Sequence, residues 1–224
     1  MSLWHHVIHP ITRHFRRQRG RFMIARFPDL CRMRICDLGG SRHFWDKLGL
    51  DIPCQNITIY NISSDETQGV NTAAAGNIKV VLYDGKRLPV EDGSFDLLVC
   101  NSVLEHVSPL QRQALVAEMH RVARHVFCQT PARSFPLEPH FLMPFVHWLP
   151  RRVGFALVHV SPWRLLSRPS AATIHEYWWG TQLLGCKEVK RLFPQACIES
   201  ERLMGLVKSY YVTSPSPSAT SASH

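Results

Sequence analysis

Short, nearly continuous apolar runs alternate with helical segments along most of the chain, and this alternation constrains the fold more than any other feature. The runs expected to form strands cover residues 33–38, 56–62, 78–84, 95–101, 125–130 and 208–213. Strands that are apolar at nearly every position have both faces covered, which is typical of parallel sheets with helices on each side. The sequence therefore predicts an α/β fold with a doubly wound, mostly parallel sheet.

The helix between the fourth and fifth of these runs has the clearest start. Ser108 suits the N-cap and Pro109 suits the first helical position, where a missing N–H costs nothing. Helical spacing then predicts that Leu115, Met119 and Val122 face the core.

The two ends of the chain differ from this pattern. Residues 11–34 carry several arginines between apolar residues, which predicts an amphipathic helix with a basic outer face. This face is either a solvated cover for the sheet edge or a surface for lipid or phosphate. Residues 214–224 are rich in Ser, Pro and Ala and are expected to form a disordered tail. We expect residues 1–213 to form a single domain.

Composition limits the cellular setting and the partners. Lys and Arg number 26 against 17 Asp and Glu, a formal charge of +9, but no module that reads bases accompanies them. The seven cysteines include no CxxC pair, which favours a reducing compartment. No apolar stretch reaches the roughly 20 residues of a membrane span, and no signal-peptide pattern opens the chain. We expect a cytoplasmic protein, with peripheral contact to a membrane left open.

Polar residues and glycines stand where four of the predicted strands end. They are Asp37, Gly39 and Gly40, then Asn61, then Asp84 and Gly85, and finally Asn101 and Ser102. Each alone suits a turn, but doubly wound sheets bind ligands at these strand ends, so the series favours a nucleoside site. A GxGxxG loop for pyrophosphate is absent, which argues against a nicotinamide-dependent oxidoreductase. Phe44 and Trp45 follow the glycines instead and are expected to pack on the sheet as core aromatics.

Residues 82–107 resemble class I S-adenosylmethionine-dependent methyltransferases of the type 11 branch, in the third strand, the Leu-Pro to Phe-Asp link and the fourth strand before Glu-His-Val. Residues 130–150 and 191–212 are similar to members that methylate glycans, lipids or their precursors. The resemblance implies a Rossmann-like, seven-stranded sheet with an antiparallel C-terminal strand, and S-adenosylmethionine as cofactor. It also implies that residues 131–185 are an acceptor-side insertion.

The resemblance assigns the methionine end of the cofactor to two strand ends. Asp37 and the backbone of Gly39 and Gly40 would hold it from the first strand. Asn101 and Ser102 would line the amino-acid side from the fourth.

The nucleoside end is assigned to the second and third strands. Asn61 would face the ribose hydroxyls, Asp84 would accept from the adenine amine, and the Gly85 backbone would lie against the ring. Two features depart from the family pattern: Ser41 and His43 replace later glycines of the loop, and Asn61 replaces an acid. An amide accepts a hydrogen bond more weakly than a carboxylate, so these departures bear on the affinity for the cofactor and not on the fold.

Methyl transfer to a hydroxyl needs a group that receives the proton of the acceptor. The candidates are His106, Glu138 and His140. We expect no metal site, because the histidines, including the pair His140 and His147, lack a carboxylate or thiolate set at ligand spacing along the chain.

The acceptor is the least constrained part of the prediction. The apolar segment 135–163 carries Arg151 and Arg152. It suits buried core, a dimer contact or a groove for a lipid-linked sugar or another small metabolite. Because the net charge is positive, an RNA methyltransferase is an alternative. The altered glycine loop and Asn61 make a non-catalytic methyltransferase-like scaffold a further alternative. Oligomeric state is not fixed by the sequence.

Overall fold

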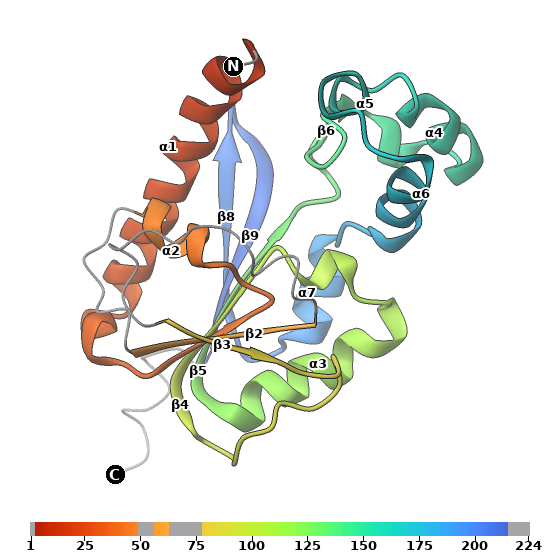
Figure 1. The fold of residues 1–224 in the computed structure, drawn as a ribbon. Coiled ribbons are helices and arrows are strands. Elements are labelled where there is room, and N and C mark those ends of the chain that lie inside the picture. The colour runs from red at the N-terminus through yellow and green to blue at the C-terminus, as the bar shows by residue number, and fades with distance from the viewer. Residues whose placement is uncertain (1–2, 49–55, 63–77, 215–224) are drawn as a thin grey trace. The chain divides into compact units, whose positions relative to one another are not determined.

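The computed structural model describes residues 3–48, 56–62 and 78–214 (Figure 1). The helices and 3-10 turns are α1 Leu3–Arg26, η1 Leu30–Arg32, α2 Arg42–Leu48, η3 Leu104–His106, α3 Pro109–Val122, η4 Val146–Trp148, α4 Arg151–Val158, α5 Pro162–Ser167, α6 Ala171–Gly180 and α7 Cys186–Leu192. The strands are β1 Ile35–Leu38, β2 Ile57–Asn61, β3 Lys79–Leu82, β4 Phe95–Asn101, β5 Ala123–Pro131, β6 Leu137–Glu138, β7 Met143–Pro144, β8 Cys197–Leu203 and β9 Leu206–Ser214.

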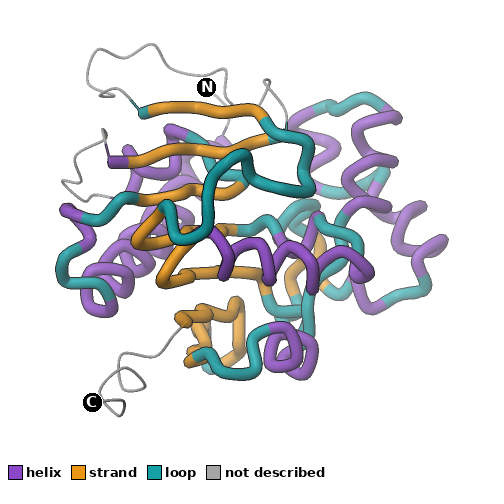
Figure 2. Tube along the Cα trace, turned by 90° about the horizontal axis from the view of Figure 1, so that it is seen from below, coloured by secondary structure: helices purple, strands orange, loops and turns teal. Residues whose placement is uncertain are grey.

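Seven strands form one sheet in the order β3-β2-β1-β4-β5-β9-β8, while β6 and β7 form a separate antiparallel pair. β1 pairs in parallel with both β2 and β4, and β2 pairs in parallel with β3. β9 runs antiparallel to β8, as predicted for the C-terminal strand. Figure 2 shows strands of the sheet side by side. The predicted fold class is confirmed.

The described residues group into two compact units. The first unit comprises residues 3–101 and 115–127, and the second comprises 102–114 and 128–214. The first unit therefore holds β1 to β4, and β5 begins in it and continues into the second.

Buried apolar side chains fill the sheet of the first unit. In β1 and β4 nearly every residue is buried, which is the pattern expected of strands covered on both faces. Leu115, Met119 and Val122 of α3 are buried, so the predicted inward face of this helix is confirmed. Phe44 and Trp45 are also buried, with their rings in an edge-on contact.

The N-terminal helix differs from its prediction. α1 ends at Arg26 rather than near residue 34, because residues 27–34 form a turn, the short η1 and the approach to β1. Arg13, Arg17 and Arg21 are exposed, as the basic face requires, but Arg19 is buried. No helix of the described residues is both long and apolar enough to cross a membrane.

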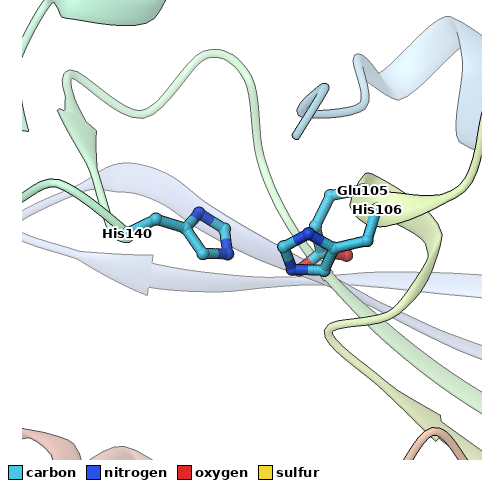
Figure 3. A group of neighbouring side chains, drawn as sticks. All are labelled: Glu105, His106 and His140. Atoms are coloured by element: carbon cyan, nitrogen blue, oxygen red, sulfur yellow. The ribbon is translucent and has the colours of Figure 1, made fainter. Parts of the chain in front are cut away.

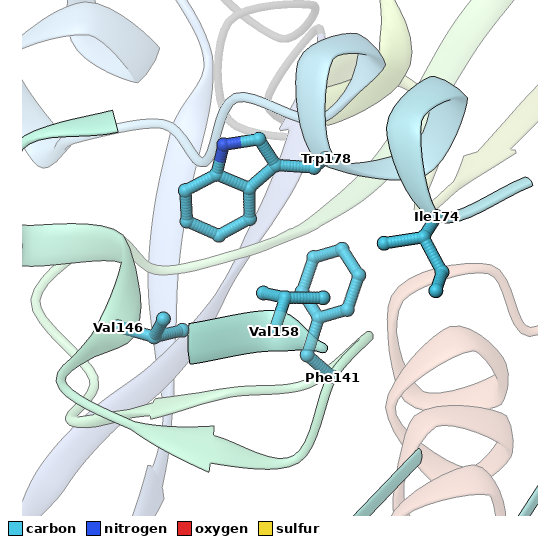
Figure 4. Packing of buried hydrophobic residues seen from close by; sticks show 5 residues of the cluster. All are labelled: Phe141, Val146, Val158, Ile174 and Trp178. Carbon is cyan, nitrogen blue, oxygen red and sulfur yellow. The ribbon is translucent and has the colours of Figure 1, made fainter. Parts of the chain in front are cut away.

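In the second unit, a small core forms within the segment 131–185. Phe141, Val146, Val158, Ile174 and Trp178 pack together there (Figure 4). A Cβ atom on Gly154 would lie 2.4 Å from the Trp178 ring, so this glycine permits α4 and α6 to approach closely. The segment thus has its own apolar centre, built from η4, α4, α6 and the loop before β7.

A buried carboxylate helps to fix the hairpin of β8 and β9, of which β8 was not predicted as a strand. Glu201 accepts hydrogen bonds from Ser209 and Tyr211 and pairs with Lys208 at 2.6 Å. Burial raises the pKa of Glu201, but Lys208 and these hydrogen bonds outweigh it and lower the pKa. β8 is an edge strand, and four consecutive polar or charged residues, 199–202, interrupt it, which explains why it lacks the apolar signal of the other strands.

Candidate functional site

The strand ends of the first unit line up in register. Leu38 of β1 is paired with Tyr60 of β2 and with Cys100 of β4, so the residues after these three share one edge of the sheet. Asn61 is paired with Leu82 of β3. The predicted series of polar strand-end residues therefore meets at one edge of the first unit, apart from Ser102, which begins the second.

Asp37 is fully buried in β1, and only one of its carboxylate oxygens is satisfied. The indole Nε1 of Trp45 donates to Oδ2 at 2.7 Å, while Oδ1 has no hydrogen-bond partner among the described residues. Burial raises the pKa of Asp37 to about 7, although the Trp45 hydrogen bond opposes the rise. A buried acceptor without a partner is costly, and it is a place where a ligand with an N–H group would be stabilised.

The glycines after β1 are required by space and by backbone geometry. Gly39 has φ of +66°, and its N–H donates to the carbonyl of Tyr60 at 2.7 Å. A Cβ atom on Gly40 would lie 1.8 Å from Oδ2 of Asp37. The Asp37 carboxylate thus occupies the volume of the missing side chain, and the two residues can exist together only because Gly40 has none.

Asn61 braces this loop from β2. It is 2% exposed, its Nδ2 donates to the Gly40 carbonyl at 3.3 Å, and its Oδ1 accepts from the N–H of Ile62 at 2.7 Å. An aspartate could accept but could not donate to a carbonyl. The amide that departs from the family pattern therefore has a local structural role.

Asp84 and Gly85 form an exposed turn after β3. One oxygen of Asp84 accepts from the N–H groups of Lys86 at 2.9 Å and Arg87 at 3.2 Å. These hydrogen bonds lower the pKa of Asp84, so the carboxylate is charged at neutral pH. Gly85 has φ of +77°, a conformation that favours glycine.

The end of β4 has a partner that the sequence did not predict. Arg19 of α1 is 8% exposed, and its guanidinium donates to Oδ1 of Asn101. The sequence placed Arg19 on a basic outer face, and this placement is wrong for that residue. Ser102, in the second unit, has φ of +56°, and its hydroxyl donates to Gln129 at 2.9 Å.

The three candidate catalytic residues lie together in the second unit. Nδ1 of His140 is 2.7 Å from Oε1 of Glu138, and the rings of His140 and His106 have centroids 4.9 Å apart. Burial lowers the pKa of His106 to about 4, with a further contribution from His140. Burial also opposes charge on His140, but the hydrogen bond and charge of Glu138, together with Glu105, outweigh it and raise the pKa.

Glu105, which the sequence did not single out, belongs to the same group. Its side chain is fully buried, Oε2 accepts from Thr130 at 3.1 Å, and Oε1 has no hydrogen-bond partner within the part of the chain that the structure describes. Burial raises the pKa of Glu105, against the opposing effects of its own backbone N–H, His140 and Thr130.

A pocket of about 430 Å³ opens in the second unit beside this group. It is lined by Glu138 and Thr181, which hydrogen-bond to His140 and to His106 respectively. The lining also includes aromatic and basic side chains, among them Phe141, Trp148, Trp178, Arg133, Arg151 and Arg191, together with leucines and one carboxylate, Glu188. Apolar rings beside guanidinium groups suit a ligand with both an apolar and an anionic part.

Arg151 illustrates how the pocket wall is held. Its Nη2 donates to the carbonyl of Trp178 at 2.5 Å, and its guanidinium lies 4.9 Å from the Trp179 ring centroid. Its buried Nε has no hydrogen-bond partner. Burial lowers the pKa of Arg151.

Residues 39–125 match the family model described as "Methyltransferase domain", type 11. No curated protein matches the sequence. Among solved structures, magnesium protoporphyrin IX methyltransferase from Synechocystis PCC 6803, with bound SAH, has a TM-score of 0.58 at 11% identity, over 95% of this chain and 87% of that one. A SAM-dependent methyltransferase from Archaeoglobus fulgidus has a TM-score of 0.56 at 12% identity, over 90% of this chain and 93% of that one.

The N-terminal domain of EvdMO1, with SAH and D-fucose, has a TM-score of 0.53 at 15% identity, over 88% of this chain and 81% of that one. These likenesses agree with the sheet order and with the predicted fold. The matched residues 39–125 include the glycines after β1 and the ends of β2, β3 and β4. Residues 39–125 therefore match a methyltransferase domain, and the chain shares the fold of the S-adenosylmethionine-dependent methyltransferases.

Proposed function

We propose that the strand ends of the first unit hold S-adenosylmethionine and that the pocket of the second unit binds a small acceptor with an apolar and an anionic part. The observation that carries the first half is the unpartnered Oδ1 of Asp37 beside Gly40, at the strand edge to which the family match extends. When bound, the cofactor supplies a methyl group on a sulfonium that leaves as a neutral thioether.

The roles of the binding residues follow from their partners. Asp37 stabilises the ammonium group of the methionine end, and the backbone at Gly39 and Gly40 passes close to it. Asn101, oriented by Arg19, lines the same end. We assign the anionic carboxylate of the cofactor to this side because a guanidinium stands there.

The nucleoside end takes the two remaining strand ends. Asp84 keeps one carboxylate oxygen outside its turn hydrogen bonds, and this oxygen accepts from the adenine amine. The Gly85 backbone lies against the ring. Oδ1 of Asn61 accepts from a ribose hydroxyl, more weakly than a carboxylate would.

For the acceptor, we favour a glycan or a lipid-linked sugar that carries a phosphate. The pocket offers exposed guanidinium groups at Arg133 and Arg191 and aromatic surface at Trp148. Sugar rings pack on aromatic faces, and phosphates pair with arginine. A neighbour of the same fold was crystallised with D-fucose, which agrees with a sugar acceptor. His106, Glu138 and His140 border this pocket and are the candidates for handling the proton of an acceptor hydroxyl.

The second unit also presents apolar side chains that would suit a lipid surface. Val160 is 64% exposed and Leu165 is 67% exposed, and Arg152 and Arg168 lie exposed in the same stretch of chain. Apolar residues flanked by arginines favour peripheral binding to anionic lipid. This surface would bring the enzyme to a membrane-embedded acceptor.

The test is transfer of a labelled methyl group from S-adenosylmethionine to three acceptors: a polyprenyl-phosphate-linked sugar, a soluble nucleotide sugar and a small RNA. We expect label in the lipid-linked sugar, and binding to vesicles that contain phosphatidylglycerol. The double variant Arg133→Gln/Arg191→Gln should raise KM for the anionic acceptor about tenfold with kcat unchanged, since a charge-assisted contact contributes about 1.4 kcal/mol or more. Arg17→Gln, on the exposed face of α1, is the matched control. Label in RNA alone would contradict the proposal.

A further inference from the structure

Three side chains with metal-binding atoms converge in the second unit. Glu105 and His106 belong to η3, and His140 follows β6. One potential ligand atom of each lies within 4.8 Å of the others. In Figure 3 the imidazoles of His106 and His140 lie next to each other, with their planes nearly perpendicular, and the carboxylate of Glu105 lies beside His106.

Each of the three is held from outside by a hydrogen bond to one atom, which leaves the other atom for a ligand. Nδ1 of His140 is 2.7 Å from Glu138, so Nε2 remains. Nδ1 of His106 is 3.3 Å from Thr181, so Nε2 remains there too. A histidine held through one nitrogen by a carboxylate or hydroxyl is the usual arrangement of a metal-ligating histidine.

Glu105, like the two histidines, has one side-chain atom held by a hydrogen bond and a second atom open to a ligand. Thr130 donates to Oε2, and Oε1 is buried without a hydrogen-bond partner. An isolated buried carboxylate is expensive, and a metal ion is one of the few partners that compensates it fully. The carboxylate is therefore fixed in orientation and offers one open oxygen, as a metal ligand would.

We propose that Glu105, His106 and His140 bind a divalent transition-metal ion of the zinc type. Two imidazoles and one carboxylate are the protein ligands of many catalytic sites, in which further positions stay open for water or substrate. Ligand atoms around zinc lie about 3.3 Å apart, since the bonds are about 2.0–2.1 Å. The three ligand atoms, now within 4.8 Å of one another, would therefore move closer together when the ion binds.

The sequence analysis predicted no metal site, because it considered only the spacing of potential ligands along the chain. Glu105 and His106 are adjacent, and His140 joins them only because the chain returns after β5 and β6. Glu138, which the sequence offered as a base, is on this account a positioning residue that acts through His140.

The site would act on the acceptor of the proposed reaction, and this consequence rests on the proposed function. A hydroxyl bound at an open position of the metal would release its proton to solvent more readily, and the resulting alkoxide would attack the cofactor methyl group as the neutral thioether leaves. The pocket borders the group through Glu138 and Thr181, so an acceptor in the pocket reaches this neighbourhood. Metal binding itself does not depend on the proposed function.

The test begins with the full chain stripped of metal by a chelator and titrated calorimetrically with ZnCl₂, and in parallel with CoCl₂ while visible absorption is recorded. We expect one equivalent to bind and the d–d bands of Co²⁺ in a nitrogen and oxygen site to appear. His140→Ala and Glu105→Gln should each weaken binding about 100-fold or more, and Glu138→Gln about tenfold. His159→Ala, an exposed histidine outside the group, should bind as the wild type does.

Circular dichroism of each variant separates loss of a ligand from loss of fold, and Glu105→Gln keeps the shape of the buried side chain if His140→Ala unfolds. Absence of one-equivalent binding to the folded wild type would overturn the proposal, as would unchanged affinity in both ligand variants. Titration with S-adenosylmethionine on the same samples distinguishes the two proposals. Metal binding without cofactor binding would refute the proposed function alone, and the reverse would refute the metal site alone.

Discussion

The Asp37→Asn substitution should stabilise the ligand-free protein, and increasingly so as the pH rises. Burial raises the pKa of Asp37 from 3.8 to about 7. Between these values the folded state holds a proton that the unfolded state has released. The favourable contribution of the protonated group is therefore complete below pH 4 and is lost as the pH rises to 7.

The size of the effect follows from the difference in pKa. One pKa unit is about 1.4 kcal/mol, so the shift changes the free energy of unfolding by about 4 kcal/mol in total. About 3 kcal/mol of this change falls between pH 5 and pH 8. Asparagine is neutral throughout, and its Oδ1 can still accept from Nε1 of Trp45. The stability of Asp37→Asn relative to wild type should rise by about 3 kcal/mol across this range.

Urea unfolding at pH 5, 6, 7 and 8, followed by circular dichroism, measures this difference directly. Asp96→Asn is the control, because its hydrogen bond with Arg34 lowers the pKa of Asp96. Asp96 is thus ionised over the whole range, and removing it should cost the same at pH 5 and pH 8. Parallel pH curves for wild type and Asp37→Asn would refute the argument from burial.

Four further predictions concern binding and packing. Affinity for S-adenosylmethionine should rise from pH 5 to pH 7 and binding should release a proton, because the ammonium group requires the ionised form of Asp37; calorimetry in two buffers of different ionisation enthalpy measures the release. Asp84→Asn should weaken cofactor affinity about tenfold without lowering thermal stability, because the carboxylate is exposed and its lost contact is to the ligand. Gly40→Ala should cost about 1–3 kcal/mol of stability by overpacking against the Asp37 carboxylate, whereas Gly180→Ala, with open space around its Cβ position, should cost little in the same unfolding assay. Trp178→Ala should cost about 3–5 kcal/mol through loss of the centre of its core cluster, and retention of wild-type stability would show that the segment 131–185 does not depend on that core.

Features that depend on local pattern could be predicted from the sequence. β1 and β4 are buried at nearly every position, so their runs are apolar apart from Asp37, Asp96 and Asn101 and are easy to recognise. Asp37, Asn61 and Asn101 end parallel strands, and the register of those strands then places them at one edge. In these cases neighbours along the chain determine the environment.

Features that depend on distant partners could not be predicted. Arg19 is one of many arginines in α1, and only its contact with Asn101, 82 positions away, explains its burial. Trp45 was recognised as a core aromatic, but its hydrogen bond to Asp37 depends on the turn geometry of the loop. Glu105 looked like the first half of a Glu-His pair, and its unpartnered oxygen and its proximity to His140 appear only in three dimensions.

The most direct test of the central claim is calorimetric titration of the purified chain with S-adenosylmethionine and S-adenosylhomocysteine, with NADH as the control ligand. The account predicts one equivalent of each of the first two, bound with micromolar affinity, and no heat with NADH. Binding of NADH, or no binding of either sulfur compound to the folded chain, would contradict it.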